Sequence, residues 1–132
     1  KTEIKKGRIK INMDITPQSL TINVDKELME QVLINLIKNA IQALCAEDDG
    51  KDKIIDLRAQ QNEKNETTIS IKDNGPGIDD EALSKIFIPF FTTKKHGSGI
   101  GLSLSKQIIR KHNGTLTVKS FIDQGAEFTI KL

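Results

Sequence analysis

Three alternating glycines, Gly97, Gly99 and Gly101, stand just before a segment with a helical pattern that ends at His112. Glycine costs about 1 kcal/mol relative to alanine inside a helix, so such a run marks a loop. Unpaired N–H groups at a helix N-terminus favour anions, which makes a phosphate site one interpretation. A flexible loop is the other. Leu102 stands where both the dinucleotide fingerprint and the P-loop pattern require glycine, so neither pattern is present. The run alone therefore does not decide between a phosphate site and a flexible loop.

The size and charge of the chain limit the classes of protein to which it can belong. It has 132 residues, enough for one domain, and a net charge of +2 from 20 basic and 18 acidic residues. This near balance predicts no nucleic-acid binding. No apolar run could cross a bilayer and no signal peptide is visible, so we expect a cytoplasmic domain without membrane contact of its own. Cys45 has no partner for a disulfide and is predicted to be a small core residue.

The hydrophobic pattern predicts the order of the elements. Alternating apolar residues indicate strands and a 3.6-residue period indicates a helix. The expected elements are strands near 8–15 and 21–24, a long helix from the N-cap Asp25 to about 46, strands at 54–59 and 67–72, a short helix at 79–86, a helix ending near 112, and a final hairpin. The basic opening, residues 1–10, is expected to be a solvated segment entering the first strand. This order predicts an α+β fold, a two-layer sandwich. Its mixed, mostly antiparallel sheet has about five strands, with about three helices on one face.

The long helix carries a stripe of carboxamides, Gln31, Asn35, Asn39 and Gln42, at helical spacing. Asparagine is unfavourable within a helix, and the solvated positions of this chain use Lys and Glu freely. The stripe is therefore either an ordinary exposed face or the lining of a site. An amide oxygen is a hard ligand that suits magnesium shared with phosphate.

Asp73 ends an apolar strand and is followed by a glycine-rich turn, Asn74-Gly-Pro-Gly77. A buried carboxylate must be paired or hydrogen-bonded. One interpretation is a local Asx turn. The other is an acceptor for the exocyclic amine of adenine, with Gly75 and Gly77 letting a flat base lie against the backbone.

Three of the five phenylalanines lie within Phe87–Phe91, just before the glycine run. Core packing explains Phe87. Phe90 and Phe91 are predicted to anchor a hinged cover whose Thr92, Thr93 and Lys94 meet phosphates.

These motifs, in this order, resemble the catalytic ATP-binding domain of sensor histidine kinases. Asn35-x-x-x-Asn39 resembles the N box, Asp73-x-Gly-x-Gly77 the G1 box, Phe87-x-Pro-Phe-Phe91 the F box and Gly97-x-Gly-x-Gly101 the G2 box, with Gly125 closing the pattern. The resemblance covers nearly the whole chain and implies the Bergerat ATP-binding fold. The short lid and its Thr-Thr-Lys look most like the nitrogen-regulation type of sensor kinase.

The resemblance implies roles for single residues. Asn39 resembles the magnesium-binding Asn and Asp73 the adenine-binding Asp. Asn35 and Lys94 are the implied catalytic residues. The implied ATP-binding set is Asn35, Asn39, Asp73, Gly75, Gly77, Ile78, Thr92, Thr93, Lys94, Gly97, Gly99, Ile100, Gly101 and Leu102. Ala126 and Glu127 depart from the family, since a hydroxyl that helps to hold an adenine-bound water often follows the last glycine.

The implied function is the binding of Mg-ATP and transfer of its γ-phosphate to a histidine on a separate dimerisation domain. That domain normally lies N-terminal to this one, makes the full kinase a homodimer, and is expected to be missing from residues 1–132. A response regulator receiver domain is the implied second partner. The alternatives are a hydrolysing ATPase of the same fold and a non-catalytic nucleotide-binding module. Hydrolysing relatives place a Glu where this chain has Asn35, and an amide cannot take a proton from water. His96 and His112 are predicted not to accept phosphate.

Overall fold

The computed structural model describes residues 2–4, 9–45, 52–91 and 100–132. Within them the chain forms one six-stranded sheet in the order β1-β2-β3-β4-β6-β5. The elements are β1 (Thr2–Ile4), β2 (Ile9–Thr16), α1 (Lys26–Cys45), β3 (Lys53–Gln61), β4 (Thr67–Asp73), α2 (Asp80–Leu83), α3 (Gly101–Lys111), β5 (Thr115–Phe121) and β6 (Gly125–Lys131). β2 and β3 are parallel, and each other neighbouring pair is antiparallel.

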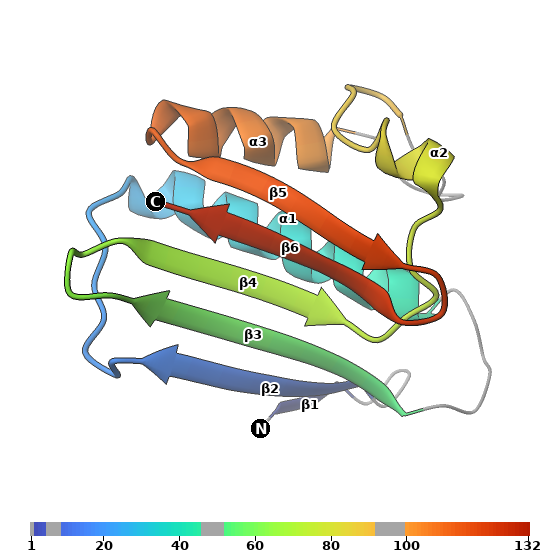
Figure 1. Ribbon diagram of the computed structural model, residues 1–132, viewed down its shortest axis with the longest axis horizontal. Coiled ribbons are helices and arrows are strands. Elements are labelled where there is room, and N and C mark those ends of the chain that lie inside the picture. The colour runs from blue at the N-terminus through green and yellow to red at the C-terminus, as the bar shows by residue number, and fades with distance from the viewer. Residues whose placement is uncertain (1, 5–8, 46–51, 92–99) are drawn as a thin grey trace.

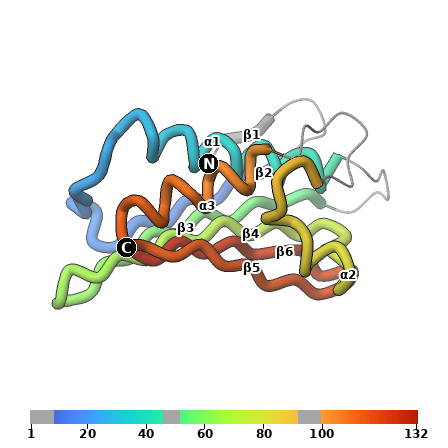
Figure 2. The backbone as a smooth tube through the Cα atoms, turned by 90° about the horizontal axis from the view of Figure 1, so that it is seen from above, coloured from blue at the N-terminus to red at the C-terminus, as the bar shows by residue number. Residues whose placement is uncertain are grey.

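The helices α1 and α3 pack against each other on one face of the sheet (Figures 1 and 2). α1 covers the central strands β3 and β4, and α3 covers β5. The core between the layers is aliphatic, and its most completely buried members are Ile9, Val32, Leu36, Ile55, Ile71, Ile109, Leu116 and Ile130. The predicted two-layer sandwich with a mixed, mostly antiparallel sheet is confirmed.

Local signals in the sequence set the helix boundaries. Asp25 caps α1, because its Oδ1 accepts a hydrogen bond from the Leu28 N–H at 3.0 Å. At the other helix, His112 is the C-cap of α3, and Asn113 follows with a φ of 61°. The final hairpin then pairs Leu116 with Ile130, as the alternation predicts.

Two strand predictions are wrong. The basic opening, expected to be solvated, contains the short strand β1, which pairs Thr2 with Ile11 and raises the strand number from about five to six. Residues 21–24 form no strand. Ile22 and Val24 pack against the core. The alternation of apolar residues here therefore reflects their burial, and the segment pairs with no strand.

Cys45 also differs from its prediction, because it is exposed at the end of α1 rather than buried in the core. The apolar stripe of α1 that faces the sheet consists of Met29, Val32, Leu36, Ala40 and Leu44. Cys45 follows Leu44 by one residue, and one step along a helix turns a side chain by about 100°, out of this stripe.

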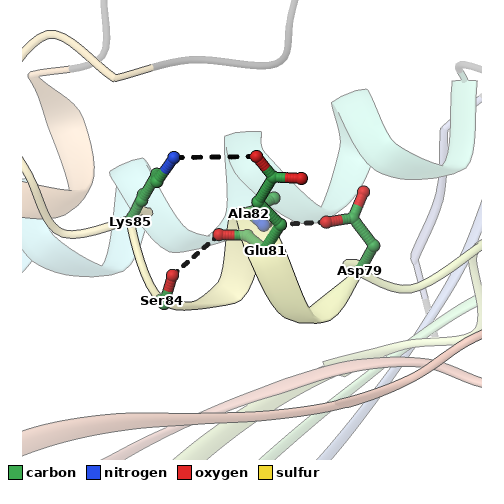
Figure 3. A network of polar contacts seen from close by, with 5 residues as sticks. All are labelled: Asp79, Glu81, Ala82, Ser84 and Lys85. Atoms are coloured by element: carbon green, nitrogen blue, oxygen red, sulfur yellow. Dashed lines mark hydrogen bonds and ion pairs between the residues drawn. The ribbon is translucent and has the colours of Figure 1, made fainter.

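The short helix expected at 79–86 is a single turn, α2, stabilised by side chains of the helix and of the residues that flank it (Figure 3). Asp79 is its N-cap and accepts from the Ala82 N–H at 2.7 Å. Glu81 and Lys85 form an exposed ion pair at 3.8 Å. α2 lies at the end of the sheet where β4 ends and α3 begins (Figure 1).

Candidate functional site

Asp73, the last residue of β4, is a nearly buried carboxylate with 3% of its surface exposed. Its Oδ1 accepts from the Gly75 N–H at 2.9 Å and lies 3.4 Å from the Ala126 nitrogen, which also donates to it. The bond to Gly75 is the local Asx-type turn that was one of the two interpretations. The bond to Ala126 joins β4 to β6, so the fold fixes the orientation of this carboxylate from two sides.

The glycine turn after Asp73 is held against the β5–β6 hairpin. Gly77 has a φ of 82°, and a Cβ there would collide with the Phe121 carbonyl oxygen. The Ile78 N–H donates to the Ser120 hydroxyl oxygen at 2.6 Å, and the Asp123 N–H donates to the Pro76 carbonyl at 2.8 Å. The turn is therefore a fixed surface beside Asp73, as a floor for a flat ligand requires.

Gly125 is the tightest backbone contact of this site. Its φ is 97°, and a Cβ there would collide with the carbonyl oxygen of Asp73. Only glycine adopts this conformation at low cost, and only glycine leaves room for the Asp73 backbone. Gly125, the closing glycine of the motif, thus packs directly against the Asp73 backbone, a contact that the sequence pattern does not reveal.

Some carboxamides of the stripe on α1 make contacts within the structure, and others are exposed. Asn35 Nδ2 donates to the Gly101 carbonyl at 3.3 Å and to the Ser105 hydroxyl oxygen at 3.2 Å, both on α3. Gln31 Nε2 donates to Asn35 Oδ1 at 3.4 Å. Asn39 is half-buried one turn further along α1, and Gln42 is exposed. The side of α1 that carries Asn35 therefore faces α3, and Asn39 lies on the same side by helical spacing.

The glycine run ends at the first turn of α3. The N-cap of this helix is Ile100, which makes no side-chain cap bond, and Gly101 follows as the first helical residue. A Cβ on Gly101 would lie 3.6 Å from Asn35 Cγ, in ordinary contact. The third glycine therefore faces α1, and the N–H groups of the first turn, Leu102 among them, belong to a helix N-terminus that favours anions.

The phenylalanine cluster is only partly an anchor. Phe87 packs edge-on against Phe128, with ring centroids 6.4 Å apart, and Lys106 Nζ lies 4.3 Å from the Phe87 ring centroid. Phe91 is half-buried against the core. Phe90 is 74% exposed, so the prediction that it anchors the following loop is wrong.

Several predicted site residues lie outside the described residues: Thr92, Thr93, Lys94, Gly97 and Gly99, as does His96. Among the described residues, no group of three His, Cys, Asp or Glu side chains could hold a metal ion. No helix in the described part of the chain is long and apolar enough to cross a membrane.

Asp73, the glycine turn, Asn39 and the start of α3 thus gather around one end of the sheet. The motif order implied that these residues lie together, and the binding of ATP among them stays a prediction. The family model described as "Histidine kinase-, DNA gyrase B-, and HSP90-like ATPase" matches residues 24–132. The chain belongs to this family, and the identification from the ordered motifs is confirmed.

Individual relatives are sensor kinases. The chain is 43% identical to the signal transduction histidine-protein kinase AtoS of Escherichia coli strain K12 over 126 residues, covering 96% of this chain and 20% of AtoS. It is 40% identical to the sensor histidine kinase ZraS of Salmonella typhimurium, covering 84% of this chain and 23% of ZraS. It thus spans about a fifth of the length of these relatives. The finer likeness to nitrogen-regulation kinases stays a prediction.

Solved structures agree with the fold. The nucleotide-free catalytic domain of the histidine kinase ThkA matches with a TM-score of 0.79 and 31% identity, covering 94% of this chain and 78% of that one. ThkA in complex with the response regulator protein TrrA matches with a TM-score of 0.76 and 30% identity, covering 96% of this chain and 34% of that one. The chain is therefore an ATP-binding catalytic domain of the sensor histidine kinase type.

Proposed function

We propose that this domain binds Mg-ATP at the end of the sheet beside Asp73 and presents the γ-phosphate to a histidine on a separate dimerisation domain. The observation that carries the proposal is the Asp73 carboxylate, which is nearly buried and fixed by the N–H groups of Gly75 and Ala126. A buried acceptor discriminates strongly, because a base without a matching donor leaves it unsatisfied. Adenine offers an exocyclic amine at this place, whereas guanine offers a carbonyl oxygen.

The phosphates would lie between α1 and the first turn of α3. The N-terminus of α3 supplies a partial positive charge, and Ile100 and Leu102 are the proposed backbone donors. Asn39 is the residue that would hold Mg²⁺ through its amide oxygen, and the ion would neutralise phosphate charge. Thr92, Thr93, Lys94, Gly97 and Gly99 remain proposed contacts from the loop before α3.

The contacts of Asn35 favour phosphotransfer over hydrolysis. Its Nδ2 donates to α3, and its Oδ1 accepts from Gln31. A side chain engaged in this way, and with no basic site, cannot activate water. A hydrolysing ATPase is therefore the weaker alternative. A non-catalytic nucleotide-binding module would bind ATP without passing phosphate to any histidine.

The partners of the proposed kinase follow from its chemistry. A histidine-bearing dimerisation domain of the same homodimeric kinase would accept the phosphate, and a response regulator receiver domain would take it onward. This domain would then be the C-terminal catalytic part of a cytoplasmic kinase module, whether or not the whole kinase is membrane-anchored.

Isothermal titration calorimetry with ATP, GTP and magnesium tests nucleotide binding. We expect ATP to bind and GTP to bind at least tenfold more weakly. Mixing the domain with a histidine-bearing dimerisation domain from a close relative and γ-labelled ATP then tests the reaction. Acid-labile label on that domain supports a histidine kinase, phosphate release without label supports the ATPase, and nucleotide binding with neither supports the module.

A further inference from the structure

We infer that Ser105, with Asn35, is a positioning residue for the phosphate-binding end of α3. Ser105 is completely buried, yet it carries a polar hydroxyl on the face of α3 that meets α1. Its oxygen accepts from Asn35 Nδ2 at 3.2 Å. This inference rests on the proposed function, because it concerns the phosphate end of the nucleotide site.

The geometry ties α3 to α1 at two points, one in its first turn and one at the start of its second. Asn35 Nδ2 donates both to Ser105 Oγ and to the Gly101 carbonyl, at 3.2 and 3.3 Å. Gly101 and Ser105 are four residues apart and therefore lie one above the other on the same face. Because Nδ2 carries two hydrogens, one amide can satisfy both acceptors.

The orientation of the Asn35 amide is set from the opposite side. Gln31 Nε2 donates to Asn35 Oδ1 at 3.4 Å, so the oxygen of the amide is directed along α1 and the nitrogen toward α3. Position 101 leaves room for this approach, since even a Cβ on Gly101 would lie in ordinary contact with Asn35 at 3.6 Å. The three side chains Gln31, Asn35 and Ser105 thus form a polar clasp between α1 and α3, called the clasp below.

The clasp fixes the helix start against the helix that carries Asn39. The N-terminal N–H groups of α3 and the Asn39 amide are the two proposed partners of the phosphates and their metal ion. A loss of the clasp removes none of the hydrogen bonds that hold Asp73 and the glycine turn, because these bonds lie within the turn and between it and the β5–β6 hairpin. The clasp should therefore act on the phosphates and not on the base.

This difference separates positioning from a general effect on folding. In Ser105→Ala, we expect the affinity for Mg-ATP, measured by calorimetry, to fall about three- to tenfold, as for loss of one hydrogen bond. Adenosine affinity, measured by NMR titration, should stay unchanged. Thr67→Val is the matched control. The Thr67 hydroxyl is also buried and also accepts from a carboxamide, Gln61 Nε2 at 3.1 Å, but it lies at the end of β4 opposite Asp73, so this variant should keep the wild-type ratio of the two affinities.

A double-mutant cycle tests the coupling between the partners. Asn35→Ala and Ser105→Ala should be non-additive, because either change removes the same contact. Asn35→Asp is a near-isosteric second variant. Its carboxylate cannot donate to the Gly101 carbonyl, so it should also weaken Mg-ATP selectively.

The inference is overturned if Ser105→Ala leaves Mg-ATP affinity unchanged, if it weakens ATP and adenosine equally, or if the effects of Asn35→Ala and Ser105→Ala simply add. Each of these results requires that the wild-type domain binds Mg-ATP. Failure of the wild-type domain to bind Mg-ATP would instead defeat the proposed function itself.

Discussion

His112 accepts a hydrogen bond from the backbone N–H of Asp25, with 3.1 Å between its Nε2 and the Asp25 nitrogen. Its Nδ1 lies 2.8 Å from the Ile108 carbonyl oxygen. The two partners together select the tautomer that carries its proton on Nδ1. One imidazole therefore joins the N-cap of α1 to the C-cap of α3, at the opposite end of the two helices from the glycine turn.

Replacing this imidazole should affect stability and not nucleotide binding. We expect His112→Ala to lower the free energy of unfolding by about 1–2 kcal/mol, because it removes two partly exposed hydrogen bonds. Urea unfolding followed by circular dichroism measures this change. Lys111→Ala, at the exposed neighbouring residue, is the control and should change stability by less than about 0.5 kcal/mol. Equal stability of the two variants would show that the link to Asp25 contributes nothing.

Asp73→Asn tests the adenine contact. If the carboxylate accepts from the adenine amine, ATP and ADP should both bind about 1–3 kcal/mol more weakly, as expected for loss of a charge-assisted hydrogen bond. The change is nearly isosteric, so the far-ultraviolet spectrum should stay as in the wild type. An unchanged ADP affinity in calorimetry would exclude Asp73 from the base-binding site.

Asn39→Ala tests the metal contact. We expect this variant to lose affinity for Mg-ATP while binding of ADP in the presence of EDTA changes little, because only the first complex needs a metal ligand. Titrating ATP with and without magnesium separates the two contributions. Equal losses in both conditions would mean that Asn39 is structural or contacts the base.

Gly125→Ala should be severe. An alanine there combines a φ of 97° with a collision against the Asp73 carbonyl oxygen. Strain of this kind costs about 1–3 kcal/mol, and a shift of the Asp73 backbone should also weaken ATP binding. Thermal unfolding and calorimetry on the same sample test both effects. Wild-type values in both would show that the β5–β6 hairpin can yield without moving Asp73.

The sequence predicts this fold well where local chemistry decides it. Asp25 marks the start of α1, and the alternation around Leu116 and Ile130 gives the final hairpin. The prediction fails where a strand depends on a partner that is distant in the sequence. β1 was missed because its residues stand among charged ones, and residues 21–24 alternate without pairing with a strand.

The same limit applies to the site. The motifs predict Asp73, Gly75 and Asn39 as a set, because each residue type carries its own chemistry. The contact of Asn35 with Ser105 spans 70 residues, and no periodic pattern reveals it. A buried serine on the apolar face of a helix is the one signal that could have pointed to it.

Our last prediction is that residues 1–132 neither label themselves nor hydrolyse ATP at a useful rate. His112 lies at the far end of α3, about 16 Å along the helix from Gly101, and both its ring nitrogens are engaged. Asn35 cannot act as a base for water.

Incubation with γ-labelled ATP and magnesium tests both points. Acid-labile label on the chain would identify one of its own histidines as an acceptor, which His96→Gln and His112→Gln would then distinguish. Fast phosphate release would place the domain among the hydrolysing members of its family. Adding a histidine-bearing domain as a separate chain should produce labelling, although weakly, because covalent linkage normally supplies a high effective concentration.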